Sequence, residues 1–150
     1  MTQKKFTEES DLSLKLFVVL TRALQSVEKQ IIKDIKKHGL NLSEFAVLEL
    51  LYNKGDQPIQ KIGQKVLLAS SSMTYVVDKL EKKEYLKRRA CSEDRRVTYA
   101  TITEKGKILM DDIFPKHKEA INQIMAGLNS NEKEAMIEQL KKLGYYAQDL

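Results

Sequence analysis

The sequence predicts a mainly α-helical protein that carries one small β-hairpin. Only 2 Pro and 6 Gly interrupt its 150 residues, so long stretches rich in Leu, Ile, Lys and Glu can stay helical. The segment VTYATI (97–102) instead alternates with the period of two that is typical of a strand. Hydrophobic residues make up 42% and charged residues 31%, which suits one folded domain over residues 1–150.

The first predicted helix spans residues 11–37. Ser10 or Asp11 can cap its start, and His38 and Gly39 suit a helix end with a left-handed exit residue. Apolar residues recur along it at steps of three and four, which places them on one stripe; they are Leu16, Leu20, Leu24, Val27, Ile31 and Ile35. Further apolar residues widen this surface; they are Phe17, Val18 and Val19. We expect the helix to pack against more than one partner.

A second helix is predicted from Ser43 to Lys54, and Gly55 closes it. Its inward face is formed by Phe45, Leu48, Leu51 and Tyr52. Residues 58–59 are predicted to form a very short strand, and residues 60–67 a short third helix.

A fourth helix is predicted to begin in the serine run, with Ser70 or Ser71 as its cap, and to continue to Lys83. Its inward residues are Val76, Val77 and Leu80. Residues 85–89 and 97–102 then form two strands around a loop at residues 90–96.

Two long helices complete the chain. Thr103 caps the first, and Pro115 should kink or break it because proline removes a hydrogen bond and crowds the preceding turn. Ser130 or Asn131 caps the second, whose apolar stripe is Met136, Leu140 and Leu143.

This order, six helices with a hairpin after the fourth, predicts a winged helix-turn-helix over about residues 43–102. Long helices at about residues 11–38 and 103–149 flank it. The net charge is +5, and residues 59–99 alone hold ten Lys and Arg against five acids, so the flanks together contribute no excess. Focused positive charge indicates a polyanionic partner. The alternative is an ordinary solvated basic face.

The first turns of the fourth helix carry side chains that suit a DNA groove. Small hydroxyls donate to phosphates and base edges and let a helix come close. The candidate groove contacts are Ser70, Ser71, Ser72, Thr74 and Tyr75. The candidate phosphate contacts are Lys79, Lys82 and Lys83. The alternative is that the serine run is simply a cap and a loop.

Arg95 and Arg96 lie at the tip of the predicted hairpin, from which guanidinium groups can enter a minor groove. We expect Asp94 to hold one of these arginines by a bidentate contact that fixes its direction. An ordinary exposed ion pair is the alternative.

The segment LASSSMTYVVDKLEKKEYLKRRACSEDRRVTYATITEKG (68–106) resembles the core of the MarR (multiple antibiotic resistance regulator) family of winged-helix regulators. The wing signature of that family, DxRxxxxxLTxxG, is matched by Asp94, Arg96, Ile102, Thr103 and Gly106. The resemblance extends to HGLNLSEFAVLELLYNKG and to the long first and last helices, so it covers nearly the whole chain. Ile102 replaces the usual leucine, and Glu84 stands where many relatives have glycine, which should change the conformation or strain of that turn.

The resemblance implies a homodimer whose first, fifth and sixth helices intertwine and which binds a pseudo-palindromic operator in double-stranded DNA. It implies that Arg96 enters the minor groove, that Asp94 orients it, and that the fourth helix reads the major groove. It also implies a repressor that a small aromatic or electrophilic, quinone-like effector releases from DNA.

Two further sites are predicted. The effector pocket would lie between the winged lobe and the dimer helices, lined by Phe17, Leu20, His38 and Phe45. Cys91 is the candidate for oxidation, because neighbouring arginines would favour its thiolate. The alternatives are that His38 serves the helix end and that Cys91 is an incidental exposed residue.

Other classes of function find little support. Ser70 to Ser72 lack the glycines of a nucleophile elbow and neither His has a recognisable partner, so we expect no enzyme. A single Cys and 2 His leave no zinc cluster, and we expect no metal and no cofactor. No apolar run approaches the roughly 18 residues of a membrane span, and the N-terminal segment lacks a signal-peptide core, so we expect a cytoplasmic protein without a membrane partner. A winged-helix module that binds RNA or protein is the second hypothesis.

Overall fold

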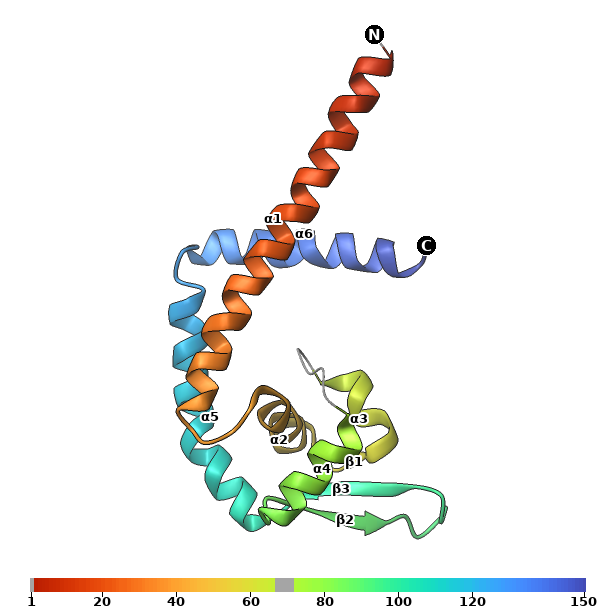
Figure 1. Cartoon of the computed structure of the whole chain (residues 1–150), viewed down its shortest axis with the longest axis vertical. Helices are drawn as coiled ribbons and strands as arrows, with labels where there is room; N and C mark the ends of the chain where they lie inside the picture. Colours follow the sequence, from red (N-terminus) through yellow and green to blue (C-terminus); the bar gives the residue numbers. More distant parts are fainter. Residues whose placement is uncertain (1, 67–71) are drawn as a thin grey trace.

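The computed structural model describes residues 2–66 and 72–150 of the chain. In these residues six helices and three short strands follow one another in the predicted order, which confirms the mainly α-helical fold with a small wing (Figure 1). The helices are α1 (Thr2–Lys36), α2 (Leu42–Lys54), α3 (Ile59–Lys65), α4 (Met73–Lys82), α5 (Glu104–Ile124) and α6 (Ser130–Gln148). The strands are β1 (Gln57–Pro58), β2 (Leu86–Ala90) and β3 (Thr98–Ile102).

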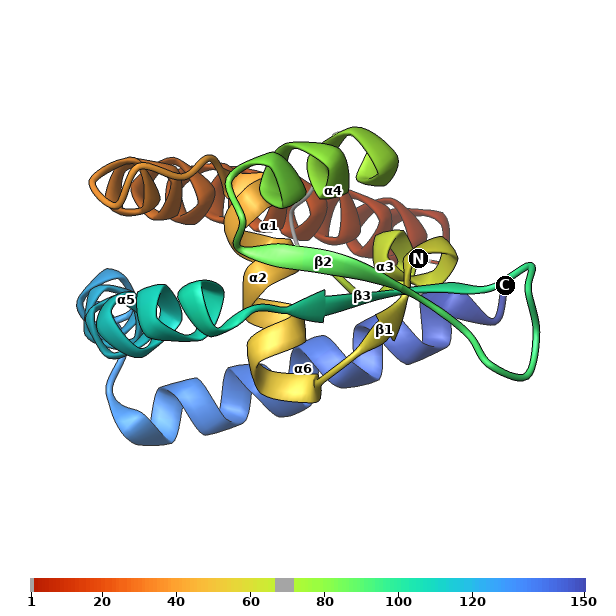
Figure 2. The same cartoon turned by 90° about the horizontal axis from the view of Figure 1, so that it is seen from below.

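The wing is a three-stranded antiparallel sheet with the order β1-β3-β2, so the predicted hairpin gains a short strand on its other edge. Leu86 pairs with Ile102 in the hairpin, and Gln57 pairs with Ala100 on the opposite side of β3. Figure 2 shows the loop between β2 and β3 extending beyond the helices. The start of α3 is therefore held against the same strand that leads away from the hairpin tip.

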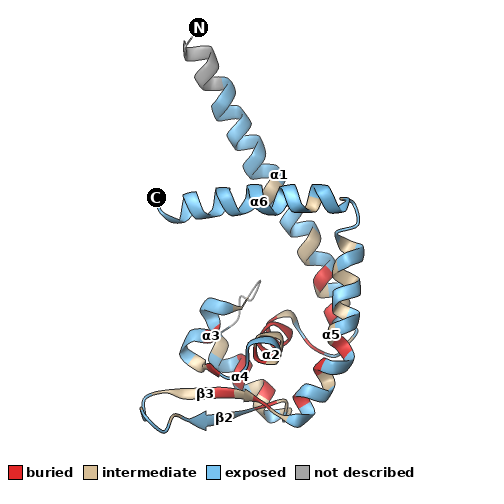
Figure 3. Cartoon of the chain, turned by 180° about the vertical axis from the view of Figure 1, so that it is seen from behind, coloured by how far each residue is buried: buried red, intermediate tan, exposed pale blue. Residues whose placement is uncertain are grey.

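The hydrophobic core lies in the lobe where α2, α4, the sheet and α5 meet, seen as the red segments of Figure 3. The side chains of Leu48 and Leu51 on α2 are buried there with Val77 and Leu80 of α4 and Met110 of α5. The predicted inward residues Val76, Val77 and Leu80 are thus confirmed as buried. Tyr52, also predicted inward, packs against this core while partly exposed.

Helix α1 begins much earlier than predicted, because Thr2–Lys36 is one continuous helix. Ser10 and Asp11 lie inside it, so the prediction that one of them caps it is wrong. The residues before them contain Lys, Glu and Gln and no Gly or Pro, and nothing stops helix propagation there. Gly39 has a φ of 76°, which confirms the left-handed exit.

Helices α2 and α6 begin with the same capping box. Asn41 caps α2 and Asn129 caps α6, and in each a Glu three residues later, Glu44 or Glu132, accepts a hydrogen bond from the backbone N–H of that Asn. The predicted caps Ser130 and Asn131 are therefore wrong. The reciprocal pair satisfies two backbone donors, so it fixes the start at Asn129.

Helix α4 ends in a Schellman motif: the N–H of Tyr85 donates to the carbonyl of Leu80 (3.1 Å) and that of Glu84 to the carbonyl of Glu81 (2.9 Å). Glu84 has a φ of 67°, a left-handed conformation that favours glycine. The departure from the family pattern therefore appears as strain carried by Glu84.

Thr103 caps α5 as predicted, because its hydroxyl accepts a hydrogen bond from the N–H of Gly106 at 3.0 Å. The prediction that Pro115 breaks the helix is wrong, since Glu104–Ile124 continues through it. Figure 1 shows the helix changing direction along its course, as the alternative of a kink requires. Pro115 is exposed, so water can satisfy the backbone carbonyl that loses its partner.

The first half of α1 extends away from the lobe (Figure 1). Helix α6 crosses behind α1 in Figure 1 and lies apart from it in Figure 2. Both helices expose large apolar side chains, including Leu16, Phe17 and Val19 on α1 and Leu140 and Leu143 on α6. No residue of α6 is buried in the single chain. These faces need a further surface to cover them.

Candidate nucleic-acid interface

The outward face of α4 carries the polar residues predicted to meet DNA. Ser72, Thr74 and Tyr75 are exposed, with 62% of Tyr75 accessible, while the opposite face of the helix is buried in the core. Ser72 is the N-cap of α4, but its side chain makes no capping hydrogen bond. The hydroxyl therefore stays available to a partner. The predicted caps and contacts Ser70 and Ser71 lie outside the described residues.

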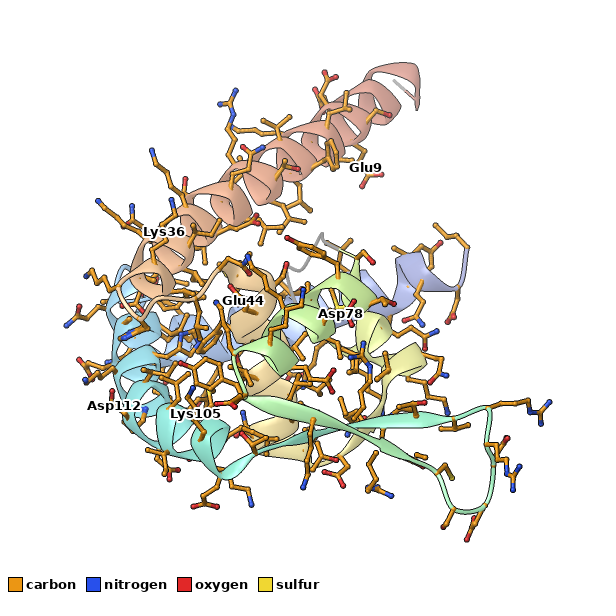
Figure 4. The ribbon with its side chains drawn as sticks, turned by 60° about the horizontal axis from the view of Figure 1, so that its bottom comes forward. Glu9, Lys36, Glu44, Asp78, Lys105 and Asp112 are labelled. Atoms are coloured by element: carbon orange, nitrogen blue, oxygen red, sulfur yellow. The ribbon has the colours of Figure 1, made fainter. Side chains whose placement is uncertain are left out.

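The three predicted phosphate contacts have different surroundings. Lys82 is exposed at the end of α4, and the ammonium of Lys79 lies 5.9 Å from the centre of the Tyr75 ring. Lys83 instead donates to Oε2 of Glu44 at 2.6 Å, and Glu44 is only 2% exposed (Figure 4). Its charge is thus already used inside the protein, so a phosphate could only share it.

The hairpin tip presents Arg96 with a fixed direction. Asp94 accepts hydrogen bonds from Nε of Arg96 at 3.2 Å through Oδ1 and from Nη2 at 3.5 Å through Oδ2. The bidentate contact expected from the sequence is confirmed. The backbone N–H of Arg96, which also donates to Oδ1 at 3.0 Å, and then its guanidinium lower the pKa of the Asp94 carboxyl, which stays ionised at neutral pH. Arg96 remains 90% exposed, and Arg95 beside it is also exposed.

Two arginines of the basic segment are engaged at the base of the wing. Arg88 binds Asp78 and Glu81 of α4, with Nη1 donating to Oε1 of Glu81 at 2.6 Å. Arg89 lies 3.3 Å from Asp56 and over the ring of Tyr99. These contacts hold the sheet against the lobe, so the charges of Arg88 and Arg89 are partly used inside the protein.

A cavity of about 330 Å³ lies where α1, α2 and α5 meet, the region predicted for an effector. Its walls include Ile31, Ile35, Leu42, Phe45, Glu49 and His117. Of the four residues predicted to line it, the structure brings only Phe45 there. Phe17 is 65% exposed on the distant part of α1, and Leu20 and His38 lie outside the walls. In the single chain, Phe17, Leu20 and His38 therefore do not line this cavity.

Two polar residues of the cavity wall, Glu49 and His117, were not predicted from the sequence. The rings of His117 and Phe45 are 4.5 Å apart, and Nδ1 of His117 is buried without a hydrogen-bond partner among the described residues. Burial raises the pKa of Glu49, and the charge of His117 acts in the opposite direction. No local motif marks them, since Glu49 and His117 meet only when α2 packs on α5.

Cys91 is partly exposed where β2 leads into the hairpin loop. In residues 2–66 and 72–150 no three His, Cys, Asp or Glu side chains gather as metal ligands. None of the helices in this part of the chain has the length and apolar character to cross a membrane.

An exposed polar helix beside a wing with a directed arginine is the arrangement of a winged helix-turn-helix transcriptional regulator. Comparisons with known proteins agree. The MarR family profile matches residues 40–98. The chain is 58% identical to the HTH-type transcriptional regulator MhqR of Bacillus subtilis over 135 residues, which covers 90% of this chain and 93% of that protein. The chain belongs to the MarR family and is a DNA-binding transcriptional regulator, not an enzyme.

Solved structures share the fold at lower sequence identity. AbsC, a MarR family regulator from Streptomyces coelicolor, matches with a TM-score of 0.80 at 17% identity, over 91% of this chain and 95% of that chain. BpsR of Bordetella bronchiseptica, whose DNA binding is regulated by 6-hydroxynicotinic acid, matches with a TM-score of 0.74 at 23% identity, over 84% of this chain and 90% of that chain.

Proposed function

We propose that the protein is a repressor that binds a specific sequence of double-stranded DNA as a homodimer. The observation that supports this most is the combination of an exposed α4 face, with Ser72, Thr74 and Tyr75, and a hairpin tip where Asp94 directs Arg96. A helix of this kind fits the major groove, and an extended arginine fits the adjacent minor groove. Ser70 and Ser71 remain predicted contacts.

We propose that residues 1–150 form one MarR-like domain and that α1, α5 and α6 pair two copies. Two-fold symmetry would set the two α4 helices roughly 34 to 36 Å apart, one turn of DNA, and would suit a pseudo-palindromic operator. Chromosomal DNA as the partner agrees with a cytoplasmic location.

We propose that the cavity between α1, α2 and α5 receives a small aromatic or electrophilic, quinone-like effector that releases the DNA. Its apolar walls, including Phe45, suit an aromatic ring, and His117 offers a polar contact. BpsR, which shares the fold, is regulated by a small aromatic acid. The effector would bind more tightly to dimers whose two α4 helices have a different spacing from that of the DNA-binding form. The ratio of its affinities for the two forms would set how far it shifts the protein away from DNA binding.

The DNA-binding proposal is tested by selecting duplexes from random oligonucleotides with the purified protein. Arg96→Ala should weaken binding to the selected duplex about tenfold or more per half-site, whereas Lys107→Ala, which removes an exposed charge on α5, should not. Log affinity should fall linearly with log salt. Binding that ignores sequence, or an unaffected Arg96→Ala variant, would favour the RNA- or protein-binding alternative.

The effector proposal is tested by titrating catechol, benzoquinone and 6-hydroxynicotinic acid into the protein–DNA complex and measuring release. His117→Leu should change the concentration needed for release, whereas His38→Leu, outside the cavity walls, should leave it unchanged. The reverse pattern would favour the pocket residues predicted from the sequence.

A further inference from the structure

We propose that Gln60 is a positioning residue for the wing, because it fixes where Arg96 lies relative to α4. Nε2 of Gln60, in the first turn of α3, donates a hydrogen bond to the backbone carbonyl of Arg96 at 3.2 Å. The inference rests on the proposed DNA-binding function and adds to it a residue outside both the wing and α4.

The hydrogen bonds within the hairpin tip fix its shape but not its place. The N–H of Cys91 donates to the carbonyl of Val97 at 3.0 Å, and the N–H of Val97 donates to the carbonyl of Asp94 at 3.1 Å. The carboxylate of Asp94 then holds the backbone and the guanidinium of Arg96. All these partners lie in the loop itself, so the loop could swing as a unit when the long hairpin bends or twists.

Gln60 supplies a connection from the loop to the helices. Among the described residues, its hydrogen bond is the one that joins residues 91–97 to another element. Figure 4 shows nitrogen-bearing side chains extending outward from this loop, well away from the body of the lobe. An anchor at the carbonyl of Arg96 therefore limits the swing at the residue whose side chain must reach the groove.

Helix α3 is itself held tightly against α4. A Cβ atom placed on Gly63 would lie 3.3 Å from Cγ of Met73, so the two helices approach closely beside the start of α4. Strand β1, directly before α3, pairs with β3. The Gln60 contact thus ties Arg96 to the same rigid unit that carries Thr74 and Tyr75, and sets the separation between the two groove contacts.

A direct contact between Gln60 and DNA is the competing explanation, since Gln60 is exposed. The two explanations differ in how they depend on Arg96. A positioning residue acts through the arginine and loses its effect when the arginine is absent. A residue that touches DNA itself keeps its effect.

The experiment is a double-mutant cycle on a duplex that the wild-type protein selects from random oligonucleotides. Gln60→Met, which keeps the length of the side chain and removes the donor, should weaken binding about three- to tenfold. The same change in an Arg96→Ala protein should have no effect. Hydroxyl-radical footprints of the Gln60→Met complex should lose protection in the flanking minor groove and keep that of the major-groove site. Gln64→Met, an exposed change one turn later in α3, is the matched control and should bind as wild type.

Equal losses with and without Arg96 would overturn the inference in favour of a direct DNA contact. No loss from Gln60→Met would overturn it by showing that the hydrogen bond does not affect DNA binding. If the wild-type protein selects no duplex, the proposed function fails and this inference fails with it. This outcome is seen before any variant is made, so it is distinct from a failure of the inference alone.

Discussion

At the scale of single residues, Glu84 concentrates strain at the point where α4 ends. A left-handed backbone costs a residue with a Cβ atom about 1 to 2 kcal/mol. The hydroxyl of Thr103 donates to the carbonyl of Glu84 at 2.6 Å, and Lys105 lies 3.8 Å from its exposed carboxylate. The turn is therefore held by backbone contacts that do not need the Glu84 side chain.

Glu84→Gly should raise the free energy of unfolding by about 1 kcal/mol, because relief of the left-handed strain outweighs the greater freedom of glycine in the unfolded chain. Urea unfolding monitored by circular dichroism measures it. Lys82→Gly, at a right-handed position in α4, should instead lower the free energy of unfolding by about 0.5 to 1 kcal/mol. A loss of stability in both variants would contradict this explanation.

Gly106→Ala should destabilise the protein by more than about 2 kcal/mol. A Cβ atom at Gly106 would lie 2.2 Å from the carbonyl oxygen of Tyr85, so the start of α5 would have to move away from the wing. Thermal unfolding measures the loss. At Gly127 a Cβ atom would meet no atom within 4 Å, so Gly127→Ala should hardly change the stability. Similar losses of stability in Gly106→Ala and Gly127→Ala would show that the close approach to Tyr85 does not cause the loss.

The residues whose roles the sequence predicted are those whose partners are close in sequence. Asp94 and Arg96 meet in one loop, and Thr103 caps the turn that contains Gly106. The contact between Lys83 and Glu44 joins residues 39 positions apart, so it depends on how two helices pack. Charge and spacing in the sequence could not distinguish a lysine that is available to a DNA phosphate from one that pairs with a buried carboxylate.

At the scale of elements, all six helices were predicted, but the starts of α1 and α6 were not placed correctly. The Asn-x-x-Glu pattern of the capping box was readable at Asn41 and at Asn129, and it would have placed both starts correctly. The predicted pocket residue Phe17 lies away from the cavity of the single chain for a geometric reason. Because α1 is one continuous helix, Phe17 lies roughly 27 Å along the helix axis from Ile35 at the cavity.

Lys83→Met should lower the free energy of unfolding by about 2 kcal/mol, because it leaves the buried carboxylate of Glu44 without its cation. The loss is smaller than for a fully buried pair, since the side chain of Lys83 is 36% exposed. Urea unfolding measures it. Lys82→Met, the exposed neighbour, should change stability by less than about 0.5 kcal/mol. Equal effects would mean that the pair contributes nothing to the link between α2 and α4.

At the scale of the whole molecule, the distribution of free charge sets the salt dependence of DNA binding. Lys82→Gln should reduce the slope of log affinity against log salt by about 1, whereas Arg88→Gln should leave the slope unchanged because Arg88 is paired with Asp78 and Glu81. Fluorescence anisotropy at several salt concentrations measures both. A reduced slope for Arg88→Gln would show that this arginine leaves its acidic partners and contacts phosphate.

Pairing of two chains should depend on the exposed apolar stripe of α6. Leu140→Glu should shift the protein toward monomer in sedimentation equilibrium and weaken binding to the selected duplex at least tenfold, because a charge would be buried in the proposed interface. Lys141→Glu, a change of charge at the next, exposed position, should leave the dimer intact. A wild-type protein that sediments as a monomer would contradict the proposed assembly.

The uncovered first half of α1 has a consequence for the lifetime of the protein. Its Leu16, Phe17 and Val19 gain nothing from the lobe, and a helix without tertiary support is only marginally stable in water. In the proposed homodimer a second copy would cover these side chains, so an unpaired chain would be the form that opens most easily to proteases. Resistance to proteolysis should then rise with protein concentration.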